Sequence, residues 1–189
     1  MSCAPWRSAI ALALHRNRSL AYARYLQLAT IGENHRPANR TVVFRGFLTD
    51  SDQLQFITDI RSEKTAQIQQ QPWSEACWYF PNTREQFRLT GQLTLFDAES
   101  EFQSARQKLW QDLSDNARLQ FAWPDPGQPR SEATAFAPAN PDPIQPSANF
   151  CLILLDPIQV DHLELRGEPQ NRWLYRLDDQ TWSKQEVNP

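Results

Sequence analysis

Residues 86–96 read Gln86-Phe87-Arg88-Leu89-Thr90-Gly91-Gln92-Leu93-Thr94-Leu95-Phe96, with polar residues alternating with apolar or small ones. Successive side chains of a β-strand point to opposite faces, so this run predicts a strand with one packed face and one face that is wet or contacts a partner. A second run rich in aromatic residues, Ala76–Phe80, precedes it across the turn-forming residues 81–83. The two runs predict an antiparallel β-hairpin.

Further strands are predicted on both sides of this hairpin, and helices are few. Alternating, β-branched or aromatic runs predict strands, whereas apolar residues three and four apart predict amphipathic helices. Because strands and helices do not alternate, we expect a mostly β fold, a largely antiparallel β-barrel with flanking helices. The further strands are expected at residues 24–31, 41–44, 54–58, 150–155, 160–165, 172–177 and 181–187, and the helices at residues 5–17, 63–71 and 102–113.

A proline-rich segment interrupts this pattern before the later strands. Seven of the 14 prolines lie between Pro124 and Pro146. Proline cannot donate a backbone hydrogen bond and restricts the residue before it, so the segment cannot continue a sheet. We therefore expect a surface loop or lid at about residues 124–147, within a single domain that spans residues 1–189.

Composition excludes several classes of function. The 19 Lys+Arg and 22 Asp+Glu give a net charge of -3, and no basic run is long enough to neutralise a nucleic-acid backbone. The apolar block Ile10–Leu14 is too short to span a bilayer, so neither a membrane partner nor a cleaved leader is expected. The three cysteines and three histidines are widely separated, which favours a reducing, cytoplasmic location and predicts no metal site.

Basic and hydroxyl residues gather at the ends of several predicted strands. They lie in the segments Arg40–Gly46, Phe56–Lys64 and Gln86–Gly91, and later in Arg172–Arg176. Their order and spacing resemble the pyridoxamine 5'-phosphate oxidase family, the FMN-binding split β-barrel flavoproteins. The resemblance extends over residues 21–189, is weakest in the proline-rich segment, and is greatest to an oxidase-related branch of unknown substrate.

The resemblance implies which residues hold FMN. Arg40 and Lys64 would bind the phosphate beside the helix N-terminus at Ser62, because cations and free amides suit a group with about −1.5 to −2 charges. Gln86 would contact the isoalloxazine ring, and Arg172 would reach the cofactor from the other subunit. No catalytic residue is implied, since the protein would position and tune the flavin. The implied cofactor-binding set is Arg40, Thr41, Val42, Val43, Arg45, Ile57, Thr58, Ser62, Lys64, Gln86 and Arg172.

Several of these basic and polar residues also have a plain structural explanation. Single arginines such as Arg40, Arg45 and Arg88 also serve as solvated charges at strand edges, where they limit aggregation. Ser62 alone indicates a helix cap, and Gln86 alone indicates a wet sheet face. Their joint occurrence in the family's order favours the FMN interpretation.

Two departures from the family pattern bear on activity. Glu63 stands where the family usually has an arginine before the lysine, so one phosphate-binding cation is absent or is replaced by Arg61. Upstream of Arg172, the family's Arg-x-His pair, which holds the vitamin phosphate, is replaced by Glu168-Pro169-Gln170. A carboxylate and an amide do not take over that role, which argues against vitamin B6 oxidation.

Two functions of different classes follow. The first is a homodimeric, cytoplasmic FMN-dependent oxidoreductase that acts on an unknown small molecule, with the flavin at the subunit boundary. The alternative is a split-barrel protein that holds a flavin as a carrier or sensor without turnover, because no acid–base residue is evident beside Gln86.

Overall fold

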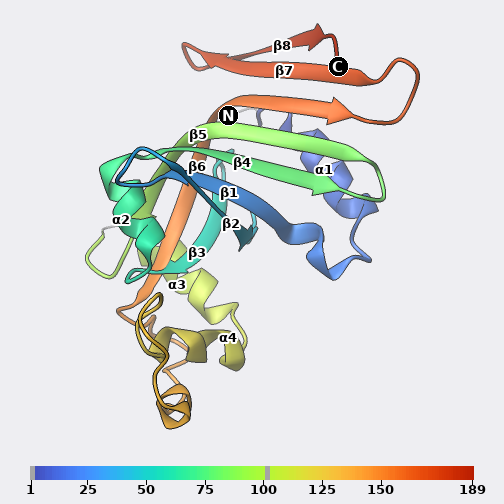
Figure 1. The fold of residues 1–189 in the computed structure, drawn as a ribbon. Coiled ribbons are helices and arrows are strands. Elements are labelled where there is room, and N and C mark those ends of the chain that lie inside the picture. Colours follow the sequence, from blue (N-terminus) through green and yellow to red (C-terminus); the bar gives the residue numbers. More distant parts are fainter. Residues whose placement is uncertain (1–2, 101–102) are drawn as a thin grey trace.

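The computed structural model describes residues 3–100 and 103–189, and strands make up more of its regular structure than helices do (Figure 1). Phe102, expected in a helix, lies outside the described residues. The strands are β1 (Tyr25–Ile31), β2 (Pro37–Val43), β3 (Leu54–Asp59), β4 (Trp73–Phe80), β5 (Glu85–Phe96), β6 (Phe150–Glu164), β7 (Asn171–Asp178) and β8 (Thr181–Val187). The α-helices are α1 (Arg7–Arg16), α2 (Glu63–Gln70), α3 (Gln103–Gln111) and α4 (Asp115–Leu119), and 3-10 helices cover Ala21–Arg24, Gln120–Ala122 and Ala133–Phe136.

All strand pairings in the described residues are antiparallel, which confirms the predicted fold class. The sheet has the order β2-β1-β4-β5-β6-β7-β8, and β3 pairs with β6 outside this path. The predicted hairpin forms between β4 and β5, with Tyr79 opposite Gln86. Phe87 and Leu89 are fully buried, as the alternation predicts.

One long strand replaces the two short strands expected at residues 150–155 and 160–165. β6 is continuous over both segments and pairs with β5 on one side along its length. The sequence favours a break around Pro157, but this proline lies opposite Gly91 at a β-bulge where the register shifts. A bulge relaxes the ladder pattern, so a residue without an N–H is accommodated there.

Two hydrophobic clusters lie along β6. The larger one packs α1 and α2 with most of the sheet and includes the fully buried Trp6 and Trp78. The smaller one packs α3, α4 and Phe121 against Phe150 and the following residues of β6. Figure 1 shows α3 and α4 at one end of the molecule and the β7–β8 hairpin at the other.

β2 is an edge strand of the sheet. In the described part of the chain, β2 pairs with β1 alone, so its other edge is not part of a ladder. Residues 124–147 are irregular apart from the 3-10 helix Ala133–Phe136. Among the described residues, no helix has the length and apolar character needed to cross a membrane.

Candidate functional site

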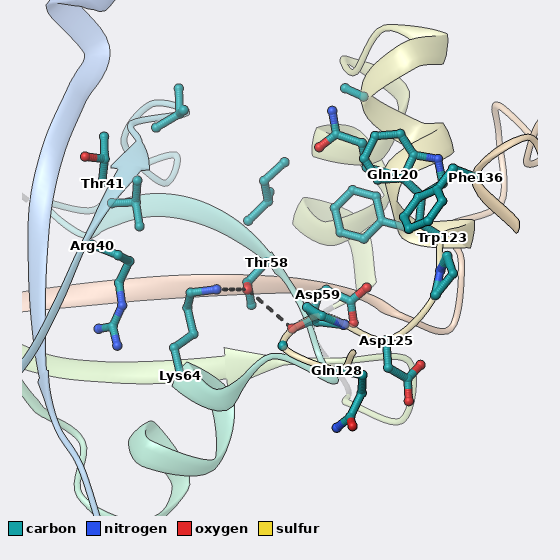
Figure 2. Close-up of a pocket in the computed structure, with 18 of the residues that line it drawn as sticks. Arg40, Thr41, Thr58, Asp59, Lys64, Gln120, Trp123, Asp125, Gln128 and Phe136 are labelled. Atoms are coloured by element: carbon teal, nitrogen blue, oxygen red, sulfur yellow. Dashed lines mark hydrogen bonds between the residues drawn. The ribbon is translucent and has the colours of Figure 1, made fainter. Parts of the chain in front are cut away.

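A cavity of about 710 Å³ lies between β2, β3 and the proline-rich loop. This volume is within the usual range of small-molecule sites, about 300–1,000 Å³. One wall consists of predicted site residues from β2, β3 and α2, and Figure 2 shows Arg40 and Lys64 on this side, with Trp123 and Phe136 across the cavity. The predicted residues that line the cavity are Arg40, Thr41, Val42, Val43, Arg45, Ile57, Thr58 and Lys64.

Neutral groups hold the Arg40 guanidinium at the cavity wall. It donates to Gln67 Oε1 at 2.8 Å and to the hydroxyl of Thr30, which itself donates to Gln67 Oε1 at 2.6 Å. Gln67 is fixed in turn by donating to Glu63 Oε1 at 2.7 Å. Burial lowers the pKa of Arg40, and the negative charge of Glu63 acts in the opposite direction. Thr30 and Gln67 are buried, and neither was predicted from the sequence as a support for the arginine.

Lys64 reaches the cavity from the first turn of α2. Its ammonium group donates to Thr58 Oγ1 at 2.7 Å and to Ser62 Oγ at 3.1 Å (Figure 2 shows the first of these bonds). Ser62 occupies the N-cap position without the expected side-chain capping bond, because its hydroxyl is engaged by Lys64 and Thr58. Ser62 therefore positions the lysine. Burial and then the neighbouring Arg40 lower the pKa of Lys64.

The cavity wall carries positive charge that lacks nearby carboxylate partners. Among the described residues, no carboxylate lies within 4.0 Å of the charged groups of Arg40, Arg45 or Lys64. Burial and then Arg24 lower the pKa of Arg45, and the buried Nε of Arg45 has no hydrogen-bond partner. A bound anion would relieve this charge and satisfy such donors, so the residues present suit the phosphate of FMN.

Arg61 is bound elsewhere and does not replace the missing cation at position 63. Its guanidinium binds Asp59 through Nε at 2.9 Å and Nη2 at 2.7 Å, and it binds Asp125 through Nη1 at 2.7 Å. Nη2 also donates to the backbone carbonyl of Trp123 at 3.0 Å. These bonds direct Arg61 toward the proline-rich loop. Proline composition marked this segment as a possible lid, but nothing in its sequence identified which side chains face the cavity.

Gln86 and Arg172 are not among the residues that line the cavity of this chain. Gln86 lies on β5 and Arg172 on β7, the two strands that flank β6. Both residues are opposite Leu163 of β6 in the sheet register. Arg172 donates to Asp161 through Nε at 3.0 Å and Nη2 at 2.7 Å, and Arg88 binds the same carboxylate. Within one chain, the predicted site residues therefore form two separate groups.

The structure also gathers Glu85, His162 and Glu164, whose spacing in the sequence gave no indication of a cluster. Their ligand-type atoms lie within 4.8 Å of one another. The His162 ring is buried, stacks on Phe87 with centroids 4.0 Å apart, and shares a hydrogen bond of 2.9 Å with Glu85. Burial opposes ionisation of Glu85, but hydrogen bonds from His162 and Thr83 leave its pKa lowered. A hydrogen-bonded pair that supports the sheet end accounts for these contacts.

Sequence comparison assigns the chain to a family. The sequence pattern described as "Pyridoxamine 5'-phosphate oxidase, FMN-binding domain" matches residues 3–97. An Arabidopsis thaliana protein named pyridoxine/pyridoxamine 5'-phosphate oxidase 2 is 39% identical over an alignment 193 positions long, gaps included, that covers 98% of each chain.

Two solved structures extend this finding to the fold. A pyridoxamine 5'-phosphate oxidase-related, FMN-binding protein of Nostoc punctiforme is 68% identical, covers 100% of both chains and superposes with a TM-score of 0.97. PhzG of Burkholderia lata, in complex with tetrahydrophenazine-1-carboxylic acid, is 17% identical and superposes with a TM-score of 0.77 over 98% of this chain and 96% of its own. The fold is that of the FMN-binding split barrels. This chain belongs to the pyridoxamine 5'-phosphate oxidase family of FMN-binding proteins.

Proposed function

We propose that this protein binds FMN in the cavity between β2, β3 and the proline-rich loop and acts as an oxidoreductase on a small molecule. The observation that carries the proposal is the convergence of Arg40, Arg45 and Lys64 on one cavity without carboxylate partners in the described chain. When bound, the flavin supplies the capacity to accept or donate a hydride.

The residues of this chain would bind and orient the cofactor. Arg40 and Lys64 would pair with the phosphate, and Thr58 and Ser62 would keep the lysine directed into the cavity. The edge of β2 at residues 41–43 would offer backbone groups to the flavin, because β1 occupies only its other edge. The absorption spectrum of the purified protein, with and without added FMN, tests this proposal. Failure to bind FMN at micromolar concentrations would overturn it.

The proposal includes a homodimer in which Gln86 and Arg172 complete the site of the second copy. Exposed aromatic residues support a covered sheet face: Tyr25 is 47% exposed, Trp73 39% and Tyr79 45%. Tyr79 lies opposite Gln86 in the register, so these two side chains share that face. Sedimentation velocity tests the dimer, and a monomer that binds FMN tightly would contradict it.

The alternative function is a flavin carrier or sensor without turnover. One observation favours it: Asp59 and Asp125, which line the cavity, are both held by Arg61 and are poorly placed to accept a proton from a substrate. Rapid reduction of the bound flavin by NADH or NADPH, followed by reoxidation by a defined acceptor, would support the enzyme. Persistent failure over a broad panel of donors would support the carrier.

The name of the Arabidopsis relative makes pyridoxine 5'-phosphate and pyridoxamine 5'-phosphate the first substrates to assay. We expect slow turnover of both, because Glu168 and Gln170 stand where the family pattern has its phosphate-holding pair. The three cysteines are free thiols, as a reducing compartment would keep them, and this supports the cytoplasmic location included in the proposal.

A further inference from the structure

The proline-rich loop contributes an aromatic and cationic stack to the cavity. Trp123 and Phe136 meet edge to face with ring centroids 5.8 Å apart, and the Arg130 guanidinium carbon lies 4.1 Å from the Phe136 centroid. All three residues line the cavity, and Figure 2 shows Trp123 and Phe136 across it from Arg40 and Lys64. The stack therefore forms a wall that is distinct from the cationic β2–α2 wall.

This wall has hydrogen-bond donors without acceptors. The indole Nε1 of Trp123 is buried and has no hydrogen-bond partner. In the described chain, no hydrogen bond or ion pair involves the Arg130 guanidinium, which instead stacks on Phe136. An unpaired buried donor lowers stability, so such groups usually have a partner in the functional state. Stacking on an aromatic ring orients a guanidinium while its N–H groups remain available.

Arg61 keeps this wall in place and pairs with its two acidic residues. It binds the Trp123 carbonyl and the Asp125 carboxylate from the loop, and it binds Asp59 at the end of β3. With Asp59 and Asp125 paired to Arg61, the unpaired charge on the loop side of the cavity is that of Arg130. Arg130 is therefore the cation on this side that remains available to a ligand group of negative charge.

We propose that Arg130 determines substrate specificity by binding an anionic group, a carboxylate or a phosphate, on a planar substrate whose ring packs against Trp123 and Phe136. The inference rests on the proposed function, since the substrate would share the cavity with the flavin. The flavin phosphate would lie at Arg40 and Lys64, and the substrate anion at the opposite wall. Arg130 would thus supply the positive charge that the Glu168-Pro169-Gln170 turn lacks.

The test compares paired anionic and neutral probes on Arg130→Ala, Arg130→Lys and the wild type. The pairs are pyridoxine 5'-phosphate with pyridoxine, and 2-naphthoate with 2-naphthalenemethanol, which separate phosphate from carboxylate recognition. Binding to the FMN-loaded protein is read from the flavin difference spectrum, and binding to the apoprotein from tryptophan fluorescence. Arg18→Ala, at an exposed arginine beyond the end of α1, is the control for loss of one positive charge.

We expect Arg130→Ala to weaken the binding of at least one anionic probe by about tenfold or more. Binding of the matching neutral probe should weaken by less than about twofold. Arg130→Lys should recover part of the loss, and Arg18→Ala should match the wild type. The proposal would be overturned if Arg130→Ala weakened the binding of anionic and neutral probes equally. It would also be overturned if the wild type bound neither anionic probe more tightly than its neutral partner.

The cofactor measurement separates this inference from the proposed function. If Arg130→Ala weakened the binding of FMN much more than that of riboflavin, Arg130 would bind the cofactor phosphate and its proposed role in substrate binding would be wrong. A wild type that binds no FMN would overturn the proposed function. In that case the fluorescence titration of the apoprotein would still decide whether Arg130 recognises an anion.

Discussion

Arg61 and Asp125 are 64 positions apart in the sequence, and their side chains meet at 2.7 Å between Nη1 and Oδ1. The same guanidinium binds Asp59 through two further N–H groups, so one arginine joins the end of β3 to the proline-rich loop. Asp125 is 60% exposed, whereas the Arg61 side chain is 23% exposed. The loop is therefore attached to the sheet by an arginine that is itself fixed from the sheet side.

The first prediction concerns this attachment. Asp125→Asn should change the free energy of unfolding by less than about 1 kcal/mol, because exposed ion pairs contribute little. Arg61→Ala should release the loop, since it removes the bonds to Asp125 and to the Trp123 carbonyl together. Limited proteolysis should then cut within residues 124–147 several times faster. Lys108→Ala, which removes an exposed ion pair on α3, is the control and should leave the cleavage rate unchanged.

The second prediction separates phosphate recognition from folding at Lys64. Lys64→Met should weaken the binding of FMN by at least about tenfold and the binding of riboflavin far less, because only FMN presents a phosphate. Isothermal titration with both ligands checks this. Lys108→Met, at a 76% exposed lysine, should bind both ligands as the wild type does. Equal loss of both ligands in Lys64→Met would place Lys64 away from the phosphate.

The third prediction is a pH dependence of the apoprotein. Burial and Arg40 lower the pKa of Lys64 from 10.5, so the unfolded chain binds this proton more tightly than the folded one. The free energy of unfolding should therefore rise with pH between the lowered pKa and 10.5, and Lys64→Met should remove this rise. Below the lowered pKa the folded wild type holds the buried charge, so Lys64→Met should be the more stable apoprotein there.

Urea unfolding of both apoproteins between pH 7 and pH 10 measures the difference. Other titrating groups contribute equally to both proteins, so the difference between them isolates Lys64. If the difference in free energy of unfolding between the two proteins stayed constant with pH, the predicted change in the Lys64 pKa on folding would be wrong. The expected difference would show that Lys64, which we propose binds the FMN phosphate, lowers the stability of the unliganded fold.

Much of the fold was predictable because its strands carry clear local patterns. The alternation in β5 and the paired aromatic residues of β4 specified the hairpin, and Leu26, Leu28 and Thr30 of β1 are buried on one face as expected. The continuity of β6 was not predictable, because it depends on a bulge partner in a different strand. Only the tertiary pairing of Gly91 with Pro157 shows why a proline is tolerated there.

The fourth prediction tests this bulge. A Cβ on Gly91 would lie 2.0 Å from the carbonyl oxygen of Asp156 and 2.8 Å from Cα of Pro157, and both neighbours are backbone atoms. Gly91→Ala should therefore destabilise the protein by about 1–3 kcal/mol or more, since the β5–β6 ladder must shift. Thermal unfolding measures the loss. Gly32→Ala, where the nearest atom would lie at 3.3 Å, is the control and should change stability much less.

The site was predictable in part for a different reason. Charged residues at strand ends, taken in the family's order, selected side chains that the fold brings together on one cavity wall around Arg40 and Lys64. Their role in binding FMN stays a prediction. The supports Thr30 and Gln67 gave no signal, because a buried hydroxyl and amide in the sequence resemble any other polar residues. The loop wall gave none either, since irregular backbone has no periodicity from which side-chain direction can be inferred.

The last prediction is that Arg172 acts in trans. In one chain Arg172 binds Asp161 and is not part of the wall that holds Arg40. If a second copy completes the site, Arg40→Ala with Lys64→Ala on one chain should complement Arg172→Ala on another. A mixed dimer would have one intact site and one site that lacks all three side chains. Random pairing gives about half mixed dimers, so about a quarter of all sites should regain normal FMN affinity.

Subunit exchange between tagged chains, followed by an FMN titration, measures this recovery. Each parent protein alone should bind FMN weakly, because every site in it lacks at least one cation. Arg176→Ala, at an exposed arginine on the same strand, is the control and should bind FMN normally without mixing. If exchange is proven and affinity does not recover, then Arg172 either serves the flavin of its own chain or acts only through Asp161, where it supports the pairing of β6 with β7.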